Sequence, residues 1–103
     1  MIRVVAVITA KPGRRDELLA AFRANVPAVQ AEHGCIEYAA HADASGVGPV
    51  QAKFGSDAFV VLESWAGPEA FAAHIAAPHM AAYAKKTKDL IASRAIHVLS
   101  AIE

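Results

Sequence analysis

Apolar residues along the chain are spaced in two ways, and the first spacing predicts strands. Residues 2–10 and 58–65 are apolar at nearly every position, as in strands with both faces covered. In the second segment, Phe59, Val61, Glu63 and Trp65 alternate with Val60, Leu62 and Ser64. Residues 35–42 and 92–102 predict two further strands, because apolar side chains recur in them at close to every second position. In the first of these, Ile36, Tyr38 and Ala40 are predicted to share one face.

The second spacing predicts helices. Asp16 and Glu17 are acidic residues that favour a helix start, and an apolar stripe of helical period follows them. The stripe consists of Leu18, Leu19, Phe22, Val26 and Val29. Pro27 is expected to kink this helix, and His33-Gly34 to end it with Gly34 as a left-handed cap.

A pair of short helices and one long loop complete the predicted elements. Pro68 opens a short helix at a tolerated first-turn position, and Pro78 restarts the chain into another. Residues 43–57 are turn material around a short apolar-polar piece at residues 50–54. So long a loop in a small domain is either a lid or binding loop, or a surface excursion, and both interpretations stay open.

This order of elements predicts the fold class. Strand, helix, strand, strand, helical pair and strand form a ferredoxin-like βαββαβ sandwich, an α+β fold whose helices cover one face of a four-stranded antiparallel sheet. The length suits one domain over residues 1–103. Since the strands are apolar on the uncovered face as well, we predict a homodimer joined through the open sheet face.

Charge and composition exclude several classes of function. Lys plus Arg equals Asp plus Glu, at 10 each, so the chain lacks the basic surface that nucleic-acid binding requires. Cys35 is the sole cysteine and is expected to be a reduced, buried thiol. The apolar first residues are interrupted by Arg3 and reach a turn too soon for a signal peptide or a membrane span. We expect a cytoplasmic protein with no nucleic-acid or membrane partner.

Most candidate chemistry lies between residues 63 and 83. His74 and His79 fall on either side of Pro78, in an alanine-rich stretch where a polar side chain is expensive to bury without a partner. Around them in the sequence are Glu63, Trp65, Phe71, Met80 and Tyr83. Each also has a structural interpretation: the imidazoles can bridge the helix break, and the aromatic residues and Met80 can fill the core.

The segment from residue 59 to residue 65, followed by Glu69-Ala70-Phe71-Ala72-Ala73-His74 and Pro78-His79-Met80, resembles the antibiotic biosynthesis monooxygenase family, and within it the small quinol monooxygenase-like members. The turn at residues 11–14 and the Gly34-Cys35 step fit the same pattern. The resemblance implies a dimeric α/β barrel and a cofactor-independent oxygenase acting on quinols, phenols or anthrones. The wider superfamily also contains haem degraders, isomerases, peroxidases and proteins without known activity.

Oxygen chemistry without a metal or flavin makes specific demands on such a site. Molecular oxygen reacts slowly with closed-shell organic molecules, so the substrate must become a strong electron donor when it loses a proton, as hydroquinones do. A neutral histidine is a suitable base, which predicts His74 or His79 in that role. Trp65, Phe71, Met80 and Tyr83 are predicted to shape the pocket. Glu63 is predicted to orient one imidazole through its second nitrogen.

The predicted function is thus a monooxygenase that uses molecular oxygen on a small aromatic quinol or phenol, with no metal or other cofactor. The alternative is a non-catalytic dimeric ligand-binding or stress-response protein of the same fold. Haem degraders of the superfamily use an asparagine on the first strand, whereas Asn25, the only asparagine, lies in the first predicted helix. A zinc site is also disfavoured, because His74 and His79 are five residues apart across a proline.

Overall fold

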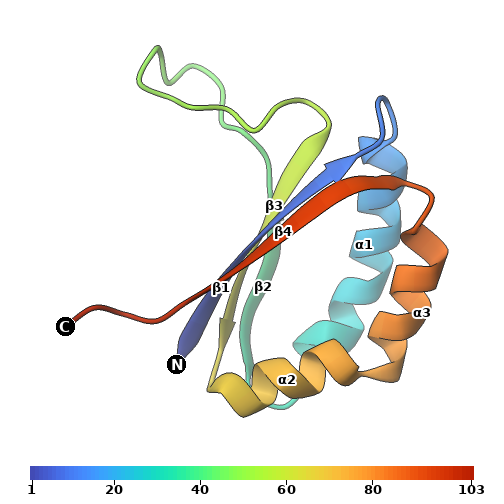
Figure 1. Ribbon diagram of the computed structural model, residues 1–103, viewed down its shortest axis with the longest axis vertical. Coiled ribbons are helices and arrows are strands. Elements are labelled where there is room, and N and C mark those ends of the chain that lie inside the picture. Colours follow the sequence, from blue (N-terminus) through green and yellow to red (C-terminus); the bar gives the residue numbers. More distant parts are fainter.

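Four strands and three helices make up the fold in the computed structural model, which describes all 103 residues (Figure 1). Their bounds are β1 Ile2–Ala10, α1 Arg15–Gln30, β2 Cys35–His41, β3 Ala58–Trp65, α2 Pro68–Ala76, α3 Pro78–Thr87 and β4 Ile91–Leu99. The strands form one antiparallel sheet in the order β2-β3-β1-β4. The predicted α+β, ferredoxin-like order is confirmed, with α2 and α3 together in the place of the second helix.

One face of the sheet carries the core. Figure 1 shows α1 and α3 side by side against this face, while α2 crosses its lower end. The strand register aligns Ala6 with Val61 and Ile96, so their side chains share the helix-facing side. The buried cluster consists of Val4, Ala6, Ala10, Leu18, Phe22, Val29, Tyr38, Phe59, Val61, Trp65 and Leu90.

The opposite face of the sheet carries no helix (Figure 1). Val5, Val7 and Leu62 lie on it and are half-buried by their neighbours within the sheet. The edge strand β4 is more open, since all its residues after Ile91 are exposed. Apolar surface therefore remains uncovered on β4, where Leu99 lies on the open face and Ile96 and Val98 lie on the helix-facing side. None of the helices combines the length and apolar character that a membrane crossing requires.

The first helix ends earlier than its sequence pattern predicted. It continues through Pro27 and ends at Gln30. A tight turn over residues 31–34 follows, in which the Glu32 N–H donates to the Val29 carbonyl at 2.9 Å. Gly34 has the expected positive φ, 83°, but it lies in this turn and not at the helix C-cap, which is Ala31. The turn brings Glu32 against α2.

Two strands also differ from their predicted extents. A register shift between Cys35 and Glu37 separates Ile36 from the buried face that carries Tyr38, and Ile36 is exposed; β2 then ends at His41. The predicted strand over residues 92–102 instead spans Ile91–Leu99. Leu99 pairs with Arg3 near the start of β1, so almost no strand remains for later residues to pair with.

Residues 42–57 contain neither helix nor strand and extend away from the helices (Figure 1, green). The carboxylate of Asp43 accepts hydrogen bonds from the backbone N–H groups of Gly55 at 2.9 Å and Phe54 at 3.1 Å. These bonds lower the pKa of Asp43. No residue of the loop borders the main cavity of the molecule, so the structure favours the surface-excursion interpretation.

Candidate functional site

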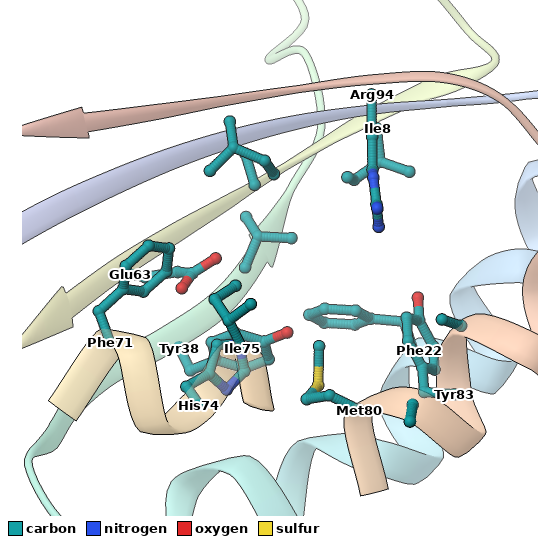
Figure 2. A pocket seen from close by; sticks show the side chains of 15 residues that line it. Ile8, Phe22, Tyr38, Glu63, Phe71, His74, Ile75, Met80, Tyr83 and Arg94 are labelled. Atoms are coloured by element: carbon teal, nitrogen blue, oxygen red, sulfur yellow. The ribbon is translucent and has the colours of Figure 1, made fainter. Parts of the chain in front are cut away.

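A mostly apolar cavity opens between the helix-facing side of the sheet and helices α2 and α3 (Figure 2). Its volume is about 250 Å³, and 12 of its 15 lining residues are hydrophobic. The lining consists of Ala6, Ile8, Phe22, Tyr38, Val61, Glu63, Phe71, His74, Ile75, Met80, Ala81, Tyr83, Ala84, Arg94 and Ile96. Sites for drug-sized ligands usually enclose roughly 300–1,000 Å³, so this cavity suits a smaller molecule.

His74 is the histidine of this cavity. It comes from the last turn of α2, and only 3% of its side chain is exposed. Its Nδ1 lies 2.8 Å from Oε2 of Glu32, in the turn after α1. In a neutral imidazole this hydrogen bond places the proton on Nδ1 and leaves the lone pair on Nε2. Nε2 is therefore the nitrogen that can accept a proton from a ligand.

Aromatic rings surround the imidazole of His74. Its centroid lies 4.7 Å from the ring of Trp65, 5.5 Å from that of Tyr38 and 6.1 Å from that of Phe71. Trp65 is fully buried and lies behind the cavity wall, whereas Tyr38 and Phe71 border the cavity. The rings restrict the imidazole to the orientation that Glu32 selects.

Glu63 is a second buried polar group on the wall. It lies on β3, and its Oε1 accepts a hydrogen bond of 2.9 Å from Nε1 of Trp65. Burial raises the pKa of Glu63, and the Trp65 hydrogen bond opposes that effect only in part. The sequence predicted that Glu63 orients an imidazole. In the structure Glu32 has that position, because the alternation of β3 directs Glu63 to its neighbour two residues along, Trp65.

Two phenols and the guanidinium of Arg94 complete the polar lining. Burial raises the pKa of Tyr83 to about 12, although the charge of Arg94 acts in the opposite direction. Burial also raises the pKa of Tyr38, further still than that of Tyr83. Both hydroxyls are therefore neutral near pH 7 and can donate a hydrogen bond to an oxygen atom in the cavity.

The predicted site residues are brought together only in part. Glu63, Phe71, His74, Met80 and Tyr83 line the cavity, whereas Trp65 and His79 do not. Nε2 of His79 is 3.3 Å from Oε2 of Glu32 but outside hydrogen-bond geometry, and both buried ring nitrogens of His79 lack a partner.

The start of α3 explains this position of His79. Ala77 is extended, with ψ 137°, so α3 begins in a new direction and turns Met80 and Tyr83 toward the cavity. His79 instead borders a second, more open hollow between α1 and α3. Within the chain, no group of three or more His, Cys, Asp or Glu side chains is arranged to hold a metal ion.

Three lining or supporting residues were missed by the sequence interpretation: Glu32, Tyr38 and Arg94. Glu32 gives no local signal, because it lies outside any periodic segment and its partner His74 is 42 residues away. Arg94 does give one, since it is a lone charge in an otherwise apolar strand segment. A charged side chain on the inner face of a strand points to a polar site or a cavity.

Fold and cavity together define a small α+β domain with a mostly apolar cavity, of a size for a small molecule, between the sheet and the helices. The family model described as antibiotic biosynthesis monooxygenase matches residues 1–86. The chain therefore belongs to the antibiotic biosynthesis monooxygenase family. This membership supports a monooxygenase-like function in general terms.

Solved structures show the same architecture at low sequence identity. PA3566 from Pseudomonas aeruginosa is 26% identical, with a TM-score of 0.81, over 99% of this chain and 94% of that one. Rv0793 from Mycobacterium tuberculosis is 24% identical, with a TM-score of 0.79, over 99% and 95%. An antibiotic biosynthesis monooxygenase that is 21% identical superposes with a TM-score of 0.80 over 100% of both chains. Among curated proteins, none matches this chain.

Proposed function

We propose that the protein is a cofactor-independent monooxygenase that oxidises a small aromatic quinol or phenol with molecular oxygen, and that His74 is its base. The observation that carries this proposal is the pairing of His74 with Glu32 on the wall of an otherwise mostly apolar cavity. Such surroundings suit a flat ring, and the imidazole presents one nitrogen lone pair to it.

The reaction balances without an external reductant. Nε2 of His74 removes a hydroxyl proton from the quinol, and the resulting anion donates electrons to oxygen. One oxygen atom bonds to a ring carbon and the other leaves as water, so that hydroquinone plus O₂ gives hydroxybenzoquinone plus water. All four electrons that reduce O₂ come from the substrate.

Other polar groups in and beside the cavity assist the reaction through their positions. Glu32 holds the imidazole so that Nε2 accepts the proton and the Nδ1 proton remains on the side of the carboxylate. Tyr38 and Tyr83, which are neutral, donate hydrogen bonds to the negative charge that develops on the substrate or on reduced oxygen. Such donors act more strongly where a bound substrate displaces water from around them.

Oxygen uptake with a panel of hydroquinones tests this proposal. A positioned base contributes about 10²–10⁴-fold to a rate, so His74→Ala is expected to lower kcat by at least about a hundredfold. Glu32→Gln, which keeps an oxygen acceptor but not the charge, is expected to lower kcat by less. His41→Ala, on the exposed end of β2, is the matched control. Wild-type oxygen uptake by the double variant His74→Ala/His79→Ala would refute the assignment.

A cavity of this kind also suits the alternative of a ligand-binding protein that performs no turnover. In that case hydroquinones would raise the melting temperature of the protein without being consumed. Haem binding, the third alternative, would produce a Soret band on titration.

A further inference from the structure

Arg94 is the permanently charged cation of the cavity wall. It lies on β4 opposite Ile8 of β1, on the side of the sheet that faces the helices. Figure 2 shows its side chain reaching from β4 into the cavity, with its nitrogen atoms directed toward the helices, while His74 lies on the opposite side. A ligand that fills the cavity therefore lies between the imidazole and the guanidinium.

No carboxylate of the chain neutralises this guanidinium. Within the chain, Arg14 pairs with Glu17, and the rings of His74 and His79 approach Glu32, but no carboxylate lies within pairing distance of Arg94. Glu63, the carboxyl on the same wall, is instead bonded to Trp65, and its burial favours the uncharged form. A guanidinium offers five N–H donors in a planar fork and accepts no hydrogen bond, so it matches the two oxygens of a carboxylate.

We propose that the ligand of this cavity is an aromatic acid, a quinol or phenol that carries a carboxylate, and that Arg94 binds this carboxylate. The aromatic ring then lies among Phe22, Met80 and Tyr83, and a ring hydroxyl faces His74. The placement of the ring hydroxyl at His74 rests on the proposed function. The preference for a negative charge rests on Arg94 alone and requires no turnover.

Binding measurements without oxygen separate these two parts. The probes are 2,5-dihydroxybenzoate and its methyl ester, which share the ring and both hydroxyls and differ in the charge. Affinities are measured by calorimetry under nitrogen. Hydrogen bonds between charged groups are stronger than neutral ones, but Arg94 is exposed, so the wild type is expected to bind the acid about tenfold more tightly than the ester. This ratio should fall as the salt concentration rises.

Substitution of Arg94 tests whether this residue causes the tighter binding of the acid than of the ester. In Arg94→Gln, the ratio of the two affinities is expected to fall close to one, and in Arg94→Lys to an intermediate value, because an ammonium attracts the carboxylate without the planar fork. Arg23→Gln is the matched control, since Arg23 is an exposed arginine on α1 that does not border the cavity. Circular dichroism confirms that each variant is folded.

Several outcomes would overturn the proposal. These are failure of the acid to bind, equal affinities for acid and ester in the wild type, or an unchanged ratio in Arg94→Gln. The proposed function fails separately: if the acid binds through Arg94 but no quinol of the panel is oxidised, the charge preference stands and the monooxygenase assignment does not.

Discussion

At the scale of single residues, His74 is fixed before any ligand arrives. Its Nδ1 is bonded to Glu32, and the rings of Trp65, Tyr38 and Phe71 enclose it. A base that need not reorient loses little conformational freedom when the substrate binds. The same neighbours explain why the side chain tolerates burial, since its buried nitrogen has a partner.

Glu63 is expected to couple stability to pH. Its folded-state pKa is raised by burial above 4.5, so the stability it contributes is complete below that value and is lost as pH rises through the folded pKa. Glu63→Gln keeps an oxygen acceptor for Trp65 but cannot ionise. Relative to wild type, its free energy of unfolding should therefore increase as pH rises from about 4 to about 7.

Urea unfolding at a series of pH values measures this trend. Glu37→Gln, at an exposed position on β2, is the control for removal of a glutamate charge. A constant difference between Glu63→Gln and wild type across the series would show that burial does not favour the protonated carboxyl.

The candidate site was predictable from sequence as far as side chains belong to periodic segments. The alternation of β3 put Glu63 on the same strand face as Trp65, the face that borders the cavity, and Met80 and Tyr83 line the cavity as predicted. Glu32 was not predictable, because its contact with His74 depends on how a turn is folded against a distant helix. His79 was placed in the cavity because the sequence does not reveal the change of direction at Ala77.

At the scale of elements, one close approach sets the position of α2. A Cβ atom added to Gly34 would lie 2.6 Å from the Cβ of Ala70 on α2. The backbone of Gly34 also has a positive φ, 83°. The absence of a side chain at residue 34 therefore lets α2 pack against the turn that carries Glu32.

Gly34→Ala is expected to lower the free energy of unfolding by about 2–4 kcal/mol, from backbone strain and from overpacking against Ala70. Gly46→Ala is the matched control, because Gly46 has a φ of 75° but no atom within 4 Å of the added Cβ. Backbone strain alone costs about 1–2 kcal/mol there. Chemical unfolding measures both variants. Equal losses would mean that the contact with Ala70 contributes nothing.

The elements themselves were largely predictable, and their ends less so. The β3 segment, Ala58–Trp65, agrees with its predicted bounds because a nearly continuous apolar run stands between turn residues. The end of α1 was predicted too late because Gly34 was interpreted as a helix cap, whereas it closes a separate turn. Ile36 was assigned to the wrong face because a strand irregularity leaves no trace in the alternation of residue types.

At the scale of the whole molecule, the edge strand β4 leaves large apolar side chains uncovered. Val98 and Leu99 point to opposite faces of the sheet, and each is about half exposed, at 51% and 50%. Apolar area of this kind on an edge strand is stabilised by burial against another surface. It supports the predicted homodimer.

Light scattering at micromolar concentration is expected to give about twice the chain mass of 10.8 kDa. Leu99→Asp should shift the mass toward that of one chain, because the introduced charge would have to be buried on the open face. Val50→Asp is the control, because Val50 is an apolar residue of the loop and is 86% exposed. This variant should leave the mass unchanged. A wild-type mass of one chain would refute the dimer.

The hydrogen bonds that the Asp43 carboxylate accepts from Phe54 and Gly55 close the loop over residues 42–57, and they have a practical consequence. The two arms of the loop are held together by a carboxylate and two backbone amides, and the segment between them lies away from both the cavity and the helices. A fluorescent tag or an immobilisation peptide inserted there would leave both ends of the insertion anchored. The loop thus offers an attachment point at which ligand binding can be recorded without disturbing the cavity that binds it.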